Sequence, residues 1–396
     1  MERPENKRGV PSVFTCVDGT EVKTKEEWFL KRRPELLELF RREEYGRLPD
    51  MKDVELHFRV ADVREGDDIM AGGAERKTVE VEAVRKGRSF IFNFVLFVPK
   101  GLKKPVPAFV LVCNRGIKDC DPARHMLSPF YPAETIISRG YACAAFRTQE
   151  VAPDYEDGFT TGFHRLFPEY AAPGAHLAKG GWEKTGRPAD AWGALTVWAW
   201  AASRIMDYFE TDPQINEKQV AVVGHSRGGK TALWCTAQDE RFAMAVSSCA
   251  GNSGDALARG SKGECIKDIV TRFPYWFAGN YQKYADHEEN LPFDQHMLVS
   301  LIAPRLVYTT SKTFDAWADP EGQFESLRQA SPVFELTGVK GLETMERPRP
   351  EHPLHEGHIG YHLKTGTHDL DEYDWERIMD FADRHMLVFQ KFLLYS

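Results

Sequence analysis

The stretch of sequence that decides how this chain is interpreted is Val222-Val223-Gly224-His225-Ser226-Arg227-Gly228-Gly229-Lys230. The apolar residues 219–223 predict a short strand, and residues 230–234 have the pattern of a helix start. One glycine stands two residues before Ser226 and another stands two residues after it. Glycine at both places leaves room for a sharp turn that larger side chains would obstruct. The pattern therefore predicts a serine hydroxyl presented on a tight turn between a strand and a helix.

A serine in this strand–turn–helix context is typical of the nucleophile in the α/β-hydrolase fold. Strand and helix patterns alternate along the chain, which favours a single sheet flanked by helices. Strands are predicted over residues 54–60, 78–84, 89–98, 107–113, 140–146, 219–223, 244–248, 305–309 and 360–363. Helices are predicted over residues 24–46, 190–209, 294–302 and 375–394. We expect an α/β protein: a three-layer αβα sandwich with a mostly parallel central sheet and loop insertions around the active site.

The domain organisation expected for the 396 residues is a single α/β-hydrolase domain, residues 1–396. Residues about 1–50 form an N-terminal helical extension in this interpretation. Residues about 155–187 are rich in glycine, proline and aromatic side chains and have no clear periodicity. We interpret that segment as a surface loop or cap-like insertion near the mouth of the active site.

The charge and composition of the chain restrict its partners. The net charge is −8 and basic residues are scattered among acidic ones, so neither nucleic acid nor an anionic membrane is an expected partner. No apolar run reaches about 18 residues, the length that predicts a membrane span. The first eight residues lack the apolar core of a secretory signal, which predicts a cytoplasmic protein. The seven cysteines are irregularly spaced and predict reduced thiols, with no metal site and no cofactor.

A serine nucleophile needs a base to take its proton and an acid to orient that base. In this fold the chain order is serine, acid, histidine. His368 lies in a Gly-Thr-His-Asp sequence just before the closing helix, where the base is expected. Asp315 is the first acid after the predicted strand 305–309, and Asp319 is its rival. We favour Asp315, because Asp319 precedes a proline and resembles a turn residue.

The oxyanion formed during acyl transfer needs two hydrogen-bond donors. The backbone N–H of Arg227, directly after the nucleophile, is the expected first donor. The second is expected from the loop at residues 114–116. The guanidinium of Arg227 is either a further oxyanion donor or one half of a surface salt bridge, and the sequence does not distinguish the two.

Several further motifs resemble those of the glucuronoyl esterases, carbohydrate esterase family fifteen, and in particular its bacterial members. The resemblance extends over roughly residues 30–390. The motifs, in chain order, are Ser226-Arg227-x-Gly229-Lys230, Phe273-Pro274-Tyr275-Trp276-Phe277, Pro292-Phe293-Asp294-Gln295-His296, Ala303-Pro304-Arg305, Trp317-Ala318-Asp319-Pro320 and Gly366-Thr367-His368-Asp369.

The resemblance implies a role for each matching residue. Ser226 is the implied nucleophile, His368 the base and Arg227 the oxyanion helper. Lys230 and Glu264 match residues that bind sugar hydroxyls, and Trp317 matches a tryptophan beside the sugar. Their structural alternatives are an ion-paired helix lysine, an ordinary surface acid and a packed loop anchor.

The chain departs from the family pattern at one position. Many members carry a triad glutamate on the loop after the strand that follows the nucleophile, and Cys249 occupies that place here. A thiol does not stabilise an imidazolium as a carboxylate does, so the acid is expected from the later loop, at Asp315. Asp255 is a remote third candidate for the acid.

The resulting hypothesis is a serine carboxylesterase that hydrolyses esters of uronic acids, as a glucuronoyl esterase or a uronate methylesterase, through an acyl-enzyme. A cytoplasmic location favours methyl esters on small oligosaccharides, pectic fragments included, as substrates. One alternative is a carbohydrate acetyl esterase of the acetylxylan type. Another is a non-catalytic carbohydrate-binding protein of the same fold. The sequence leaves the uronic acid, the alcohol and the oligomeric state open.

Overall fold

Strands of the computed structural model, which describes residues 4–66, 69–101, 103–178 and 181–386, join in one nine-stranded sheet. Their order across the sheet is β1-β2-β3-β5-β4-β6-β7-β8-β9. The strands are β1 (Glu55–Glu65), β2 (Ala74–Arg85), β3 (Arg88–Pro99), β4 (Val106–Cys113), β5 (Ala142–Arg147), β6 (Ile215–His225), β7 (Met244–Ser248), β8 (Leu306–Lys312) and β9 (Ile359–Lys364). β1, β2, β3 and β5 pair antiparallel in turn, whereas β5, β4 and β6 to β9 are parallel. The predicted α/β-hydrolase architecture and its mostly parallel sheet are confirmed.

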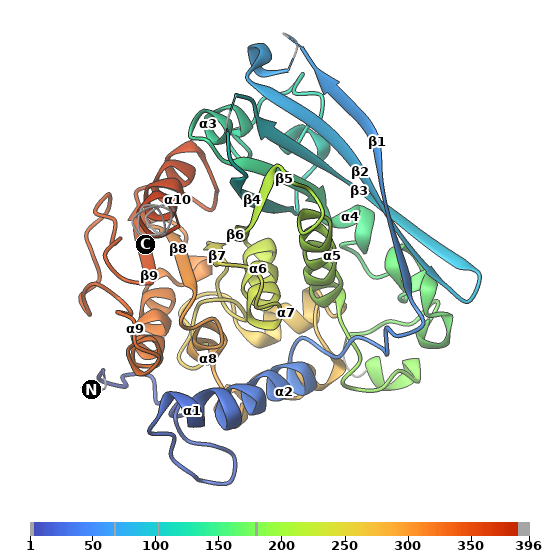
Figure 1. Cartoon of the computed structure of the whole chain (residues 1–396). Coiled ribbons are helices and arrows are strands. Elements are labelled where there is room, and N and C mark those ends of the chain that lie inside the picture. Colours follow the sequence, from blue (N-terminus) through green and yellow to red (C-terminus); the bar gives the residue numbers. More distant parts are fainter. Residues whose placement is uncertain (1–3, 67–68, 102, 179–180, 387–396) are drawn as a thin grey trace.

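Helices cover both faces of this sheet. They are α1 (Lys25–Glu27), α2 (Arg33–Glu43), α3 (Ala133–Ser138), α4 (Thr148–Val151), α5 (Ala194–Phe209), α6 (Arg227–Gln238), α7 (Ile266–Arg272), α8 (Gln295–Ser300), α9 (Pro320–Leu336) and α10 (Glu372–His385). Phe109 of β4 packs in the apolar cluster that includes α3 and α10. Its neighbour Val110 packs in the cluster that includes α5 and α6. Successive strand residues point to opposite faces, so a strand buried on both sides is continuously apolar. Figure 1 shows β1 to β3 at one end of the molecule and α9 and α10 near the other.

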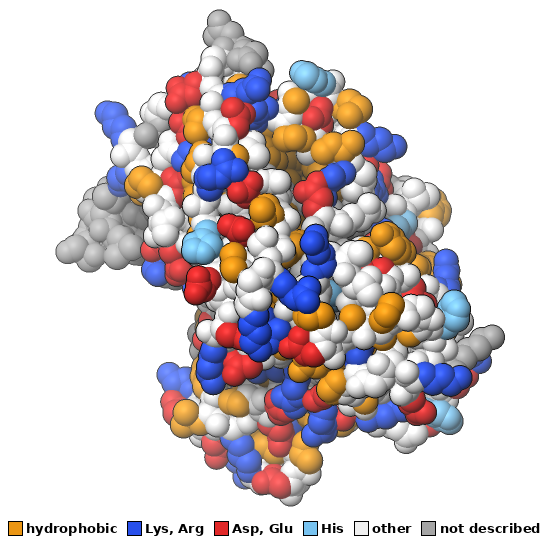
Figure 2. Space-filling view, turned by 90° about the vertical axis from the view of Figure 1, so that its right-hand side faces the viewer, with side chains coloured by type: hydrophobic (Ala, Val, Ile, Leu, Met, Phe, Trp, Pro, Cys, Tyr) orange, Lys and Arg blue, Asp and Glu red, His pale blue; other side chains and the backbone are white. Residues whose placement is uncertain are grey.

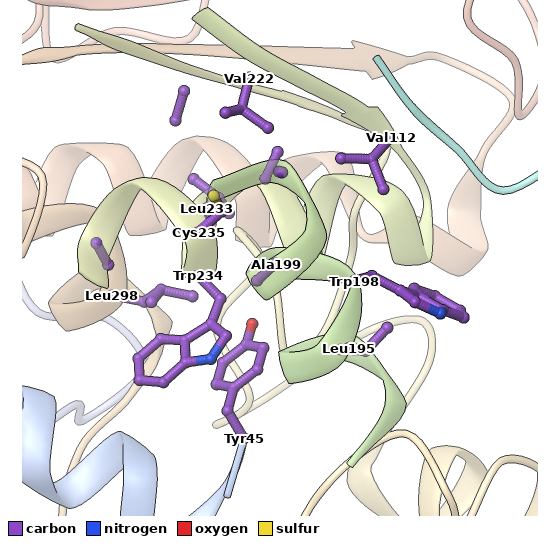
Figure 3. Packing of buried hydrophobic residues seen from close by; sticks show 14 of the residues in the cluster. Tyr45, Val112, Leu195, Trp198, Ala199, Val222, Leu233, Trp234, Cys235 and Leu298 are labelled. Atoms are coloured by element: carbon purple, nitrogen blue, oxygen red, sulfur yellow. The ribbon is translucent and has the colours of Figure 1, made fainter. Parts of the chain in front are cut away.

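The N-terminal extension forms the predicted helix, in three pieces. Thr24 caps α1 and exchanges capping hydrogen bonds with Glu27, and a π-helical turn, Trp28–Arg32, leads into α2. Beyond α2, the ring of Tyr45 stacks on Trp234 of α6 with 4.5 Å between ring centroids (Figure 3). Aromatic pairs of this kind add to the free energy gained by burial alone. The extension therefore packs directly against the helix that begins just after Ser226.

The structure corrects the prediction of a turn at Asp319. This residue is the N-cap of α9, a 17-residue helix that the sequence interpretation missed. Its carboxylate accepts a hydrogen bond from the N–H of Gly322, and Pro320 occupies the first helical position, where proline is well tolerated. Pro332 inside the helix obscures its periodicity in the sequence.

The segment 155–187 is not simply a surface loop. It contains short 3-10 turns, and its aromatic side chains Phe159, Phe163, Phe167 and Trp182 are buried in the main apolar cluster. The guanidinium of Arg187 lies 3.6 Å from the ring centroid of Phe159. Cation–π contact of this kind is favourable where water is excluded. The insertion is thus anchored to the core by its aromatic residues.

Acidic and basic side chains are interspersed on the face seen in Figure 2. Within the described residues, every helix is too short or too polar to cross a membrane. The predicted closing helix corresponds to α10, and its expected last turns, beyond residue 386, lie outside the described residues.

Candidate active site

Ser226 occupies a strained turn between β6 and α6. Its backbone has φ 57° and ψ −126°, a conformation that residues other than glycine rarely adopt. A Cβ atom on Gly224 would lie 2.0 Å from the carbonyl oxygen of Gly228, so the first glycine is sterically required. The N–H of Ser226 donates to the carbonyl of Ser248 at 2.7 Å, which ties the turn to the end of β7. The turn predicted from the sequence is present, and its serine is partly exposed.

His368 and Asp315 lie together beside this turn. His368 Nδ1 is 2.7 Å from Asp315 Oδ2, and the Asp315 side chain is nearly buried whereas that of His368 is 39% exposed. The carboxylate of Asp315 also accepts a hydrogen bond from the N–H of Ala318. The rings of His368 and His225 have centroids 4.5 Å apart, and His225 directly precedes Ser226. The candidate base is therefore oriented by an acid and packed against the residue next to the candidate nucleophile.

The two other candidate acids have different partners. Asp319 pairs with Arg8 at 2.7 Å in addition to capping α9. Asp255 is fully buried and accepts a hydrogen bond from Gln323 at 2.8 Å, and burial raises the pKa of its carboxyl to about 6. Of the three carboxylates, the one hydrogen-bonded to the candidate base is Asp315.

Cys249 lies against this pair without replacing the acid. Its Sγ atom and the candidate ligand atoms of Asp315 and His368 all lie within 4.8 Å of one another. Burial raises the pKa of the Cys249 thiol well above its usual value, and the charge of Asp315 raises it further. The thiol is therefore protonated at neutral pH and offers no negative charge to an imidazolium.

Arg227 begins α6, where backbone N–H groups have no acceptor within the helix. Its guanidinium forms an ion pair with Asp154, with Nε 2.5 Å from Oδ2. Nη2 donates to the carbonyl of Asn114 at 3.3 Å, in the loop where a second oxyanion donor was expected. Arg115 in the same loop is instead paired with Asp369 at 2.6 Å. The salt bridge foreseen as an alternative for Arg227 is present, and it fixes the guanidinium beside the Ser226 turn.

Asp154 is a residue that the sequence interpretation missed. Besides Arg227, its carboxylate accepts from Trp276 Nε1 at 2.8 Å, and its carbonyl accepts from the hydroxyl of Tyr275 at 2.7 Å. These aromatic residues belong to a motif noted in the sequence, but a lone aspartate more than a hundred residues earlier carries no local signal. His225 was overlooked because it stands at the variable position of the nucleophile motif.

Lys230 and Glu264 form a buried ion pair, with Nζ 2.8 Å from Oε2. Nζ also donates to the carbonyls of Ala250 and Asn252. A lysine ammonium has three hydrogens, so all of its donors are engaged. In this arrangement the lysine holds Glu264 in place, and its direct contact with a sugar stays a prediction.

Trp317 lies on a 3-10 turn, Ala316–Ala318, between Asp315 and α9. Its side chain is 44% exposed, which is unusual for tryptophan, and the guanidinium of Arg272 lies 5.4 Å from its ring. Its carbonyl accepts from the N–H of Glu264 at 2.8 Å, so the loops that carry these two residues are joined. The predicted sugar-binding tryptophan is therefore a partly exposed aromatic surface two residues from the candidate acid.

Comparison with known proteins places this geometry in a family. Residues 186–338 match a family model described as glucuronyl esterase, fungi. A carbohydrate esterase called MZ0003, from an unknown prokaryotic organism, is 35% identical over 404 residues, which cover 95% of this chain and 89% of that protein. The structure of a promiscuous family 15 esterase from a marine bacterial metagenome is 33% identical, with a TM-score of 0.84, and the match covers 96% of this chain and 98% of that one. The chain belongs to carbohydrate esterase family 15.

The esterase is thus a carboxylic ester hydrolase, as the motifs predicted. A more distant relative, the 4-O-methyl-glucuronoyl methylesterase of Schizophyllum commune, is 26% identical over 340 residues, covering 83% of this chain and 74% of that enzyme. The family resemblance found in the sequence is confirmed. The roles of individual residues stay predictions, and two of them are tested by the variants below.

Replacing Arg227 by glutamine should lower kcat by about 10²-fold, because a missing oxyanion donor destabilises the transition state. KM should change much less if the guanidinium acts mainly on the transition state. Steady-state kinetics on an ester substrate measures both constants. Arg115→Gln is the matched control, since it removes a neighbouring guanidinium that is paired with Asp369. Equal losses of kcat in the two variants would contradict an oxyanion role for Arg227.

Replacing Lys230 by methionine should destabilise the esterase by about 3 kcal/mol, because Glu264 would become a buried carboxylate without its cation. Glu264→Gln should cost less, since a glutamine oxygen still accepts a hydrogen bond from the ammonium. Denaturant unfolding of both variants measures the free energies. A Lys230→Met variant as stable as the unmodified protein would show that the pair has no structural role.

Proposed function

We propose that the esterase hydrolyses esters of uronic acids, with the uronoyl group as the acyl part and methyl esters on oligosaccharide fragments as substrates. The observation that carries this proposal is the His368–Asp315 pair packed beside the strained Ser226 turn, next to the loops of Glu264 and Trp317. A carboxylate and an exposed indole are the groups that suit a polyhydroxylated ring. The names of the relatives support the same substrate class.

The first half of the proposed reaction forms the acyl-enzyme. Ser226 Oγ attacks the C6 carbonyl carbon of the uronate ester while His368 takes the hydroxyl proton. Asp315 accepts a hydrogen bond from His368 Nδ1–H, which fixes the tautomer and stabilises the imidazolium. The backbone N–H and the guanidinium of Arg227 stabilise the oxyanion. The C–O bond to the alcohol then breaks, and His368 gives its proton to the leaving oxygen.

The second half releases the sugar acid. A water molecule attacks the carbonyl carbon of the acyl-enzyme, and His368 takes one of its protons. The bond to Ser226 Oγ breaks, the serine recovers its proton from His368, and the free uronic acid leaves. The chemistry needs neither a metal nor an organic cofactor.

Glu264 and Trp317 are assigned to the sugar in this proposal. The carboxylate of Glu264, held by Lys230, accepts hydrogen bonds from ring hydroxyls, and the indole of Trp317 stacks on the apolar face of the ring. The alcohol lies on the other side of the scissile bond. The cytoplasmic location stays a prediction, which fractionation of the cells that make the protein would test.

Hydrolysis of methyl glucuronate, methyl galacturonate and an acetylated xylose, compared side by side, tests the proposal. We expect turnover of at least one uronate methyl ester, at a higher kcat/KM than the acetylated sugar. Turnover of the acetylated sugar alone would contradict it and favour an acetyl esterase. Binding of uronate oligosaccharides with no turnover of any ester would instead favour a non-catalytic carbohydrate-binding protein.

A further inference from the structure

A groove of about 600 Å³ lies beside the loop that carries the candidate acid. Ala316, the residue after Asp315, contributes to its lining, together with Lys262 from the loop of Glu264. The segment Arg347-Pro348-Arg349-Pro350 also lines it. We call this depression the flanking groove. It adjoins the two loops that carry Glu264 and Trp317, so a substrate longer than one sugar can extend toward it.

The charges that line the flanking groove are not balanced. Asp319 is paired with Arg8 at 2.7 Å, and Glu321 is paired with Lys262 at 2.6 Å. Arg347 and Arg349 are exposed, and neither forms an ion pair with a carboxylate of the described residues. Two arginines that form no ion pair with a described carboxylate thus line a groove in a protein whose net charge is −8. Two neighbouring arginines that have no carboxylate partner favour an anionic ligand, even in an acidic protein.

The two arginines sit on a segment with restricted backbone freedom. Each is followed by a proline, which fixes its own φ and also limits the residue before it. The N–H of Glu351 donates to the carbonyl of Leu363 at 2.8 Å, which ties the end of the segment to β9. Arginines held in this way lose less freedom when they bind a ligand.

We propose that the flanking groove binds a free carboxylate of a second uronic acid residue, so that the esterase acts preferentially on methyl-esterified units within acidic oligosaccharides. This inference rests on the proposed function and names its substrate class more closely. A guanidinium and a carboxylate form paired, charge-assisted hydrogen bonds, which Arg347 and Arg349 are free to make. Neutral oligosaccharides and single esterified sugars gain nothing from the groove.

The kinetic test compares a trigalacturonate carrying a single methyl ester with methyl galacturonate. The double variant Arg347→Ser/Arg349→Ser should reduce the ratio of kcat/KM on the oligosaccharide to kcat/KM on the monomer by about tenfold, mainly through KM. Raising the salt concentration should reduce the same ratio for the unmodified esterase, because exposed charges are screened. Lys103→Ser/Lys104→Ser removes two exposed lysines elsewhere and should leave the ratio unchanged. An equal ratio in both double variants would overturn the proposal.

A binding test does not depend on turnover. Titration calorimetry with unesterified trigalacturonate should show about tenfold weaker binding to Ser226→Ala/Arg347→Ser/Arg349→Ser than to Ser226→Ala. Equal affinities would overturn the proposal for the groove. Arginine-dependent binding combined with no hydrolysis of any uronate ester by the unmodified protein would leave the groove supported and the proposed function refuted. Melting temperatures of all variants check that they are folded.

Discussion

Ser226→Ala should lower kcat by about 10⁵-fold or more, because the variant lacks the oxygen that forms the acyl-enzyme. The remaining rate reflects only binding and oxyanion stabilisation around a water molecule. The backbone strain at Ser226 is a property of the turn and not of the hydroxyl, so alanine should preserve the fold. Steady-state kinetics on methyl glucuronate or methyl galacturonate measures the loss.

A labelling experiment separates a lost nucleophile from a distorted site. A fluorophosphonate should modify the unmodified esterase at Ser226 and leave Ser226→Ala unlabelled. Unfolding of the two proteins should occur at the same temperature to within a few degrees. Substantial turnover by a pure preparation of Ser226→Ala would show that the strained turn is not the site of chemistry.

Asp315→Asn should lower kcat by about 10⁴-fold, since an amide in place of the carboxylate favours the wrong tautomer of the base. The carboxylate holds His368 Nδ1 at 2.7 Å and is nearly buried, so it also stabilises the imidazolium that forms during catalysis. Asparagine has almost the same shape as aspartate and should leave the loop intact. Rates on a uronate methyl ester, with the melting temperature measured in parallel, check the expectation.

The rival acid provides the matched control. Asp319→Asn removes the charge that pairs with Arg8 and caps α9, so it should lower the melting temperature while kcat changes little. A large loss of kcat in Asp319→Asn, with a small one in Asp315→Asn, would reverse the assignment of the acid. Cys249→Ala should change kcat less than Asp315→Asn does and the melting temperature less than Asp319→Asn does, because the buried thiol is neutral.

Local sequence patterns were sufficient to predict the strands of the sheet and the turn that carries the nucleophile. Buried parallel strands such as β4 are continuously apolar and bounded by turn residues, so they are recognisable without any knowledge of their neighbours. The Ser226 turn is equally local in its first glycine, because a side chain on Gly224 would clash with Gly228 four residues later. α9 was missed because Pro332 stands within it, and a proline inside a helical pattern normally indicates a break.

The pairing of distant groups was only partly predictable. His368 and Asp315 were found because the fold fixes the chain order of nucleophile, acid and base. The ion pair between Arg227 and Asp154 depends on how the chain returns across the end of the sheet, and no spacing rule encodes it. The three hydrogen bonds of the Lys230 ammonium also depend on tertiary structure, since their acceptors come from the loop after β7 and from Glu264. Sequence motifs thus identify reactive groups, whereas their hydrogen-bond partners come from tertiary structure.

The most direct test of the central claim is the mass of the covalent intermediate. The esterase is mixed with a uronate methyl ester, quenched with acid before one turnover is complete, digested, and analysed by mass spectrometry. We expect a peptide that contains Ser226 and has gained the mass of one uronoyl group, with methanol released in the same burst. A transferred group on another residue, or hydrolysis in which no modified peptide forms under conditions that trap acyl-enzymes, would contradict it.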